Sequence, residues 1–302
     1  MNILRSAEAM RADELDPIAQ KVADASAKLH QIEDGTPEEA RAFRRQRGNP
    51  FAPNPIQLES IEEREIPISS GSLTIRIYRP FGWKEGSNTG FVFFHGGGFV
   101  LGDVEQYDTV VQHIAAKSRC IAISVEYLLA PDNKIKGIHR DGFDAYKWVR
   151  ENAEELDINS EKIAIGGDSA GGNLTIGVEL LCKKENYPAP IYEILIYPSV
   201  DLSMSYPSVE EFSTGYFLTK KSMSWFRSHY LETPEQAKDA ELLFLERDLR
   251  GLSPAFVITA GFDPLRDEGK AFADSLVEHG VLVEHVCYTD MIHGFISFAG
   301  GI

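Results

Sequence analysis

A serine between two glycines is the first group in this chain that could do chemistry. Residues 167–171 read Gly-Asp-Ser-Ala-Gly, follow the β-prone run 162–166 and precede the helix-prone run 174–181. In a strand-turn-helix setting, such glycines relieve crowding around a serine that is held in a strained backbone conformation. The start of the helix favours the negative charge that develops during acyl transfer. The pattern predicts that Ser169 is a nucleophile, whereas a glycine-rich turn without chemistry is the alternative.

A second glycine-rich segment could stabilise an oxyanion. Residues 95–98 read His-Gly-Gly-Gly after the apolar run 91–94, and consecutive glycines let backbone amides approach a negatively charged oxygen. We expect the amides of Gly97 and Gly98 to act with that of Ala170. The alternatives are a flexible turn or a phosphate-binding loop. The segment lacks the Lys-Ser/Thr ending of a P-loop and the spacing of a dinucleotide fingerprint, so phosphate binding is disfavoured.

A serine hydroxyl needs a base to take its proton and an acid to orient that base. His293 follows the strand-like run 282–288, and Asp263 follows the strand-like run 255–260. The chain order serine, acid, histidine is one that recurs in hydrolases built on such sheets. Asp267 and Glu268 compete with Asp263, but they lie in the first turn of the next helix, where acids commonly complement the dipole. We expect His285 to be structural and the remaining histidines to lie at the surface: His30, His113, His139, His229 and His279.

Alternating strands and helices must position these side chains. Strand-like runs lie at 65–69, 73–78, 91–94, 120–126, 162–166, 191–197, 255–260 and 282–288, and helix-like runs at 7–31, about 36–48, 142–155 and 174–184. From the third strand onward the runs are mostly apolar, which is typical of a parallel sheet buried on both faces. The sequence therefore predicts an α/β fold.

A polar and aromatic insertion interrupts this alternation after residue 198. We expect a core formed by residues 51–198 and 251–302, and a helical cap formed by residues 1–50 and 199–250. Thr36, Pro37 and Glu39 predict a capped helix start within the first cap segment. In the second cap segment, the aromatic and apolar run Tyr216, Phe217 and Leu218 is predicted to close one end of a substrate pocket.

Composition excludes several classes of partner. The 302 residues include 46 acidic and 30 basic side chains, a formal net charge of −16, which opposes binding to nucleic acid or anionic lipid. The N-terminus lacks an apolar signal segment and no run reaches a membrane span, so we expect a cytoplasmic protein. The three cysteines, Cys120, Cys182 and Cys287, lie in apolar runs and predict buried free thiols rather than disulfides or a metal site.

Taken together, these motifs resemble the hormone-sensitive-lipase-like carboxylesterases, bacterial lipolytic family IV. The resemblance covers about residues 65–299 and rests on residues 95–98, Tyr127 with Ala130 and Pro131, residues 167–171, Tyr197 with Pro198, and residues 263–269 and 293–295. It implies an eight-stranded α/β-hydrolase sheet with a helical cap, and Ser169, Asp263 and His293 as a triad. It also implies Gly97, Gly98 and Ala170 as oxyanion donors, hydrolysis of short- to medium-chain acyl esters without a cofactor or metal, and a homodimer.

Three departures from this family lead to further expectations. Residues 127–132 read Tyr-Leu-Leu-Ala-Pro-Asp where the family has Tyr-Arg-Leu-Ala-Pro-Glu, so an arginine that could pair locally is missing. Residues 133–138 lack the usual Phe-Pro, which predicts a local rearrangement. The sequence ends nine residues after His293, where relatives continue into a closing helix. This predicts an apolar patch that a partner subunit covers or that leaves the His293 loop mobile, unless the chain is a piece of a longer protein.

Two other functions share this scaffold. An amidase or lactonase would use every residue of the same site and differ in its pocket. A non-catalytic receptor for a small molecule is the second alternative, because plant gibberellin receptors resemble the family but lack the catalytic histidine. The presence of His293 favours chemistry, with a small-molecule ester as the substrate.

Overall fold

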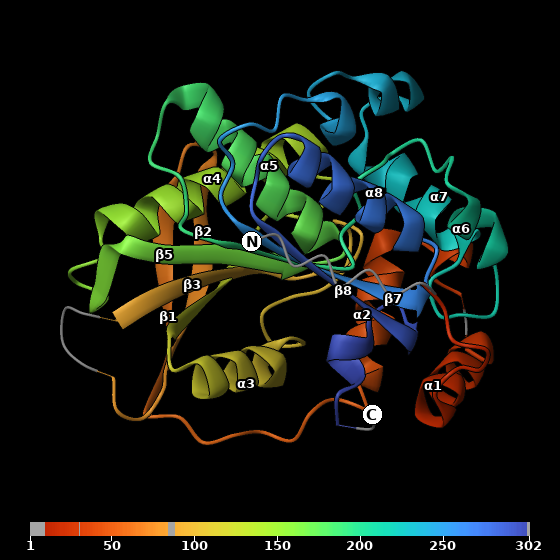
Figure 1. Ribbon diagram of the computed structural model, residues 1–302. Coiled ribbons are helices and arrows are strands. Elements are labelled where there is room, and N and C mark those ends of the chain that lie inside the picture. The colour runs from red at the N-terminus through yellow and green to blue at the C-terminus, as the bar shows by residue number, and fades with distance from the viewer. Residues whose placement is uncertain (1–9, 30, 84–87, 301–302) are drawn as a thin grey trace.

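One eight-stranded sheet forms the centre of the molecule (Figure 1). The computed structural model describes residues 10–29, 31–83 and 88–300. In sheet order the strands are β1 (Ser60–Ile68), β2 (Gly71–Arg79), β4 (Ile121–Glu126), β3 (Asn88–Phe94), β5 (Ile158–Asp168), β6 (Glu193–Ile196), β7 (Ala255–Phe262) and β8 (Val283–Ile292). Strand β2 runs antiparallel to β1 and β4, and all other neighbours are parallel. The predicted α/β-hydrolase sheet is confirmed.

Helices cover the two faces of this sheet unequally. Helices α4 (Ile135–Glu151), α5 (Ala170–Glu185) and α8 (Arg266–Glu278) lie on one face, and α3 (Asp108–Ser118) lies on the other (Figure 1). On the side of α3, apolar side chains of the last three strands are incompletely covered: Ile194, Phe256, Ile258 and Val286 are partly exposed and Tyr288 is exposed. The sheet thus keeps an apolar face beside α3.

Helix α4 begins seven residues before the predicted start at residue 142. Gly142 suggests a helix boundary in the sequence, but in the structure it lies within the helix and packs against α5, where an added Cβ would come within 2.7 Å of the Leu174 side chain. Within residues 133–138, for which we expected a rearrangement, residues 135–138 form the first turn of this helix, and Ile135 and Ile138 are fully buried. Close packing between two helices therefore explains the glycine.

Four helices gather at one end of the sheet, on the right of Figure 1. They are α1 (Pro17–Ala27), α2 (Pro37–Arg47), α6 (Pro207–Glu211) and α7 (Lys220–Tyr230). The 3-10 turn η1 (Ile32–Asp34) lies between α1 and α2, the turns η2 (Pro234–Lys238) and η3 (Phe244–Glu246) lie between α7 and β7, and η4 (Phe295–Phe298) follows β8. The predicted helix over residues 7–31 is shorter within the described residues because Asp16 caps it and Pro17 is its first residue. Residues 7–9 and 30 lie outside the described part of the chain.

The capping box predicted for α2 is present: the Thr36 side chain accepts from the Glu39 amide, and the Glu39 carboxylate accepts from the Thr36 amide at 2.8 Å. Segments from the two predicted cap regions contact each other, because Trp225 Nε1 donates to the Gly35 carbonyl at 3.3 Å and Lys221 pairs with Asp34 at 2.8 Å. The division into core and cap stays a prediction.

All three cysteines have free thiols. Cys120 and Cys182 are buried as predicted, whereas Cys287 is only half-buried and its thiol donates to the Met10 carbonyl at 3.2 Å. None of the helices within the described residues has the length and apolar character needed to cross a membrane.

Candidate active site

Ser169 occupies the sharp turn between β5 and α5. Strand β5 ends at Asp168, α5 begins at Ala170, and Ser169 has φ 56° and ψ −116°. A positive φ is uncommon for a residue with a side chain and indicates a backbone conformation that the surroundings impose. The turn fits beside β3 only because residue 171 is glycine, since a Cβ there would lie 1.9 Å from the Phe94 carbonyl oxygen. This geometry places Ser169 just beyond the carboxyl end of β5, at the start of α5.

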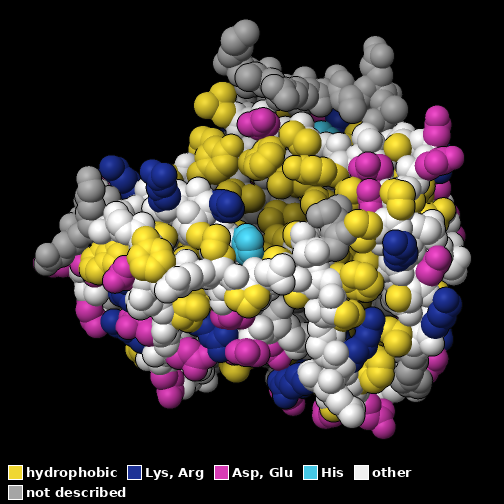
Figure 2. Space-filling model, turned by 90° about the horizontal axis from the view of Figure 1, so that it is seen from below, with side chains coloured by type: hydrophobic (Ala, Val, Ile, Leu, Met, Phe, Trp, Pro, Cys, Tyr) yellow, Lys and Arg dark blue, Asp and Glu magenta, His cyan; other side chains and the backbone are white. Residues whose placement is uncertain are grey.

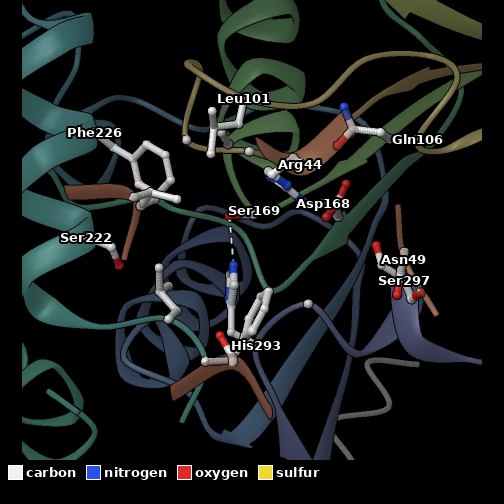
Figure 3. A pocket seen from close by; sticks show the side chains of 18 of the residues that line it. Arg44, Asn49, Leu101, Gln106, Asp168, Ser169, Ser222, Phe226, His293 and Ser297 are labelled. Atoms are coloured by element: carbon white, nitrogen blue, oxygen red, sulfur yellow. Dashed lines mark hydrogen bonds between the residues drawn. The ribbon is translucent and has the colours of Figure 1, made fainter. Parts of the chain in front are cut away.

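His293 and Asp263 complete a chain of hydrogen bonds that begins at Ser169. The Oγ atom of Ser169 is 2.9 Å from His293 Nε2, and His293 Nδ1 is 2.8 Å from Asp263 Oδ2 (Figure 3). Asp263 is fully buried and its other oxygen accepts from the Leu265 amide at 2.8 Å. Each side chain follows a strand, since Asp263 comes after β7 and His293 after β8. The carboxyl ends of parallel strands thus bring the three groups together.

The two competing acids do not reach His293. Asp267 accepts from the Ser208 amide at 2.9 Å and pairs with Arg266 at 2.8 Å. Glu268 is fully buried and accepts from the amides of Val200 and Asp201, and burial raises its pKa well above the usual range. Both carboxyl groups therefore hold neighbouring backbone rather than the imidazole.

Among the other histidines, the surface prediction for His139 is wrong. His139 is buried and its Nε2 is 2.9 Å from Asn173 Oδ1, because the earlier start of α4 turns this residue toward Gly177 of α5. Burial lowers its pKa to about 4, which keeps the ring neutral. His285 is buried within β8, 3.0 Å from Thr259 Oγ1. His113, His229 and His279 are partly exposed, and His30 lies outside the described residues.

The glycine-rich loop after β3 faces Ser169 across a shared cavity. Gly97, Gly98 and Ala170 all line this cavity, and within the described residues their backbone amides have no hydrogen-bond acceptor. Gly98 has φ 62°, and an added Cβ would lie 2.3 Å from the Phe226 ring. The loop can thus present amides to an oxygen bound beside Ser169, and α7 closes over it.

A buried carboxyl group that sequence reasoning missed links the loop to the serine turn. Asp168 Oδ1 accepts from the Gly96 amide at 2.7 Å, and its Oδ2 accepts from the Tyr107 hydroxyl at 3.0 Å. Burial raises the pKa of Asp168 to about 6, despite these hydrogen bonds. A charged residue next to Ser169, between apolar strand residues and a helix, was the available signal. Asp168 holds the relative position of the two segments.

Residues of both predicted cap segments line the cavity, whose volume is about 710 Å³. Phe217 and Leu218 line it, whereas Tyr216 instead packs against Phe262 with ring centroids 5.5 Å apart. Sequence reasoning missed further wall residues because they lie on helices without a motif: Val22, Arg44, Met223, Phe226 and Tyr230. Side chains of Phe226 and Arg44 lie on different sides of Ser169 (Figure 3).

Within the described ranges, no three His, Cys, Asp or Glu side chains are grouped so that they could hold a metal ion. The arrangement around Ser169 offers a nucleophile, a base and amide donors, which is a set suited to acyl transfer.

Comparison with known proteins places this geometry in a family. A family described as the alpha/beta hydrolase fold matches residues 91–297. Carboxylesterase NlhH of Mycobacterium tuberculosis is 32% identical over 95% of this chain and 90% of its own length. Carboxylic ester hydrolase LipN of the same organism is 34% identical over 81% of this chain and 66% of its own length. A hyperthermophilic esterase from Pyrobaculum calidifontis superposes with a TM-score of 0.89 at 34% identity, covering 96% of this chain and 93% of that one. The chain belongs to the hormone-sensitive-lipase-like carboxylesterases, a family of ester hydrolases with the α/β-hydrolase fold.

Proposed function

We propose that this protein hydrolyses carboxylic esters through an acyl-enzyme intermediate on Ser169. The observation that carries the proposal is the hydrogen-bonded chain from Ser169 Oγ through His293 to buried Asp263, at the floor of a cavity. In the first step, His293 Nε2 takes the hydroxyl proton while Oγ bonds to the ester carbonyl carbon. Asp263 holds the imidazole and stabilises its charged form.

The collapse of the tetrahedral intermediate releases the alcohol. The amides of Gly97, Gly98 and Ala170 donate to the carbonyl oxygen while it carries negative charge. His293 then returns its proton to the alkoxide as the bond between the acyl carbon and the alcohol oxygen breaks. In the second half, water gives a proton to His293 and its oxygen bonds to the acyl carbon, after which the acid leaves and Ser169 regains its proton.

We further propose that residues 1–50 and 199–250 act as a cap that limits the acyl chain. Phe217 and Leu218 lie in the cavity wall, and the Phe217 ring packs edge-on against Phe298 with centroids 5.0 Å apart. Each buried methylene contributes about 0.8 kcal/mol, so kcat/KM should rise about fourfold per carbon until the chain meets this wall. The proposed preference is for acyl chains of about two to eight carbons.

A homodimer is a further proposal, supported by exposed apolar side chains at one edge of the sheet. Strand β8 ends the sheet, Tyr288 on it is 45% exposed, and Leu282 beside it is 57% exposed. Light scattering at two protein concentrations measures the oligomeric state directly. A monomer at both concentrations would contradict this part of the proposal.

The esterase proposal is tested by a rate panel over p-nitrophenyl esters of increasing acyl length. We expect turnover of the short esters, a maximum by about eight carbons, and loss of activity in Ser169→Ala. Rates that still rise with long-chain triglycerides at an oil interface would contradict the acyl-length proposal. An active Ser169→Ala protein would contradict the assignment of the nucleophile.

A further inference from the structure

The cavity above Ser169 has a polar side and an apolar side. Figure 3 shows Arg44, Asp168, Gln106 and Asn49 on one side of Ser169, and Phe226 on the other. Seen from below, the molecule shows a hollow lined mainly by hydrophobic side chains, with basic side chains near its edge (Figure 2). A ligand that fills such a cavity has an apolar part and a polar part.

Three arginines from the last turn of α2 line the cavity: Arg44, Arg45 and Arg47. Basic side chains in a last turn complement the helix dipole, which accounts for their presence in general. Arg45 pairs with Asp103 at 3.2 Å, and Arg47 is exposed. Arg44 differs from both because it is half-buried and its side chain is directed into the cavity (Figure 3).

Within the described residues, the Arg44 guanidinium has neither an ion-pair partner nor a hydrogen-bond acceptor. The acids that share the cavity have other partners. Three of them form ion pairs: Asp103 with Arg45, Glu105 with Arg76, and Glu33 with Lys221. Asp168 accepts from the Gly96 amide and the Tyr107 hydroxyl, and Asp201 accepts from the hydroxyls of Ser203 and Ser205. Within the described residues, the cavity that contains Ser169 thus holds a half-buried cation with no direct ion-pair partner.

The charge of Arg44 acts on the base of the glycine-rich loop. Burial is the main cause of the shifted pKa values of His95, lowered to about 4, and of Tyr107, raised well above its usual range. The Arg44 charge lowers both pKa values, so its positive field reaches the residues that support the loop. An anionic group bound there would lie in this field.

We propose, on the basis of the esterase function proposed above, that Arg44 selects esters that carry a carboxylate several bonds from the scissile carbonyl. The planar guanidinium can bind one carboxylate through two parallel hydrogen bonds. A doubly charged phosphate fits less well, because Arg44 is the only half-buried arginine that the described residues place in this wall, in a protein of net charge −16. The rest of the substrate is apolar and lies against Phe226.

Two matched substrate pairs test this selectivity. In the first pair the carboxylate is on the acyl side: monoethyl adipate is compared with ethyl hexanoate by ethanol release. In the second it is on the alcohol side: 3-butanoyloxybenzoate is compared with 3-butanoyloxybenzamide by release of the phenol. The quantity measured is the ratio of kcat/KM for the anionic ester to that for its neutral partner.

The variants are Arg44→Gln, Arg44→Lys and Lys21→Gln. Lys21 is an exposed residue of α1, absent from the cavity wall, so its substitution matches the change in net charge. We expect Arg44→Gln to lower the ratio about tenfold in at least one pair, mainly through KM, because hydrogen bonds between charged groups are strong. Arg44→Lys should restore part of the ratio, and Lys21→Gln should leave it within a factor of two.

The proposal is overturned if Arg44→Gln changes neither ratio, or if Lys21→Gln lowers the ratio as much as Arg44→Gln does. A purely structural role would lower both members of a pair equally and leave the ratio unchanged, which also overturns it. If the wild-type protein hydrolyses none of the four esters, the esterase proposal itself fails. The two failures are therefore distinguishable.

Discussion

The proposed reacting groups and the cavity wall come from two differently built regions. Ser169, Asp263 and His293 each follow a strand of one sheet, and hydrogen bonds of 2.8 and 2.9 Å link them. The wall residues Phe217 and Phe226 instead lie in the insertion between β6 and β7, on short helices and loops above that sheet. The first region is held by strand register and buried hydrogen bonds, and the second mainly by side-chain packing.

We expect the two regions to tolerate substitutions to different degrees. A triad acts as a unit, so the loss of one member removes most of its contribution. Wall residues contribute apolar contacts that change in small steps with the size of a side chain. The strand-end region should therefore control whether an ester is hydrolysed, and the wall should control which ester is preferred.

The largest effect is expected for Ser169→Ala and His293→Ala. Each should lower kcat for p-nitrophenyl butyrate by at least about 10⁴-fold, because the nucleophile and its base are both required. Circular dichroism and thermal melting should stay close to those of the wild-type protein, since neither side chain fills the core of the sheet. If these variants lose activity because they unfold, the result would not support the distinction between the strand-end region and the cavity wall.

Asp263→Asn should lower kcat by about 10⁴-fold as well, because an amide favours the wrong tautomer of His293. Asp267→Asn is the matched control, since Asp267 contacts the Ser208 amide and Arg266 instead of the imidazole. We expect this control to lose less than about tenfold in kcat, because neither contact orients His293. If Asp267→Asn were the more damaging variant, Asp263 would be the wrong acid.

Asp168→Asn should have an intermediate effect, a loss of about tenfold to a hundredfold in kcat. An amide has one acceptor atom and no charge, so it can accept from the Gly96 amide only through a weaker, neutral hydrogen bond, and it cannot also accept from the Tyr107 hydroxyl. KM for a neutral ester should change less than kcat, because the amides of the loop act on the transition state. A rise in KM with kcat unchanged would instead indicate damage to substrate binding.

Asp168→Asn should also change how the free energy of unfolding depends on pH. Burial raises the pKa of Asp168 from 3.8 to about 6, so the folded protein binds a proton more tightly than the unfolded chain does. The contribution of Asp168 to the free energy of unfolding is therefore fully present below pH 4 and falls by about 3 kcal/mol as the pH rises through 6. The stability difference between wild type and Asp168→Asn, measured by denaturant unfolding from pH 4 to 8, should follow this fall and level off above pH 6. A difference independent of pH would contradict it.

The smallest effect is expected in the wall. Phe226→Ala should move the optimum of the p-nitrophenyl ester panel by one or two carbons, with changes of a few-fold in kcat/KM per carbon, because it enlarges the space beside Gly98. A loss as large as that of Ser169→Ala would remove the distinction between the two regions.

The sequence predicts the strand-end region well because that region depends on local patterns. All eight predicted strands overlap the strands of the sheet, and the motif around Ser169 has the predicted strand-turn-helix context. Chain order then places an acid and a histidine after successive strands. The remaining histidines were harder to place, as His139 shows, because its burial depends on where α4 begins and on a glycine in the neighbouring helix.

The cavity wall and the Asp168 network could not be predicted in this way. Phe226 and Arg44 are separated by about three fifths of the chain, and only the packing of α2 and α7 over the sheet brings both to one cavity. Asp168 contacts Gly96 and Tyr107, which lie 72 and 61 residues away in the sequence. Tertiary contacts of this kind leave no periodic pattern in a single sequence.

The most direct test of the account is to trap the nucleophile. The protein is incubated with a p-nitrophenyl phosphonate, which transfers its phosphonyl group to an activated serine and releases p-nitrophenol, and the modified residue is located by peptide mass spectrometry. We predict one phosphonyl group per chain on Ser169, loss of esterase activity in proportion to labelling, and no labelling in Ser169→Ala. Stoichiometric labelling of another residue with loss of activity, or full labelling of Ser169 with activity retained, would contradict the central claim.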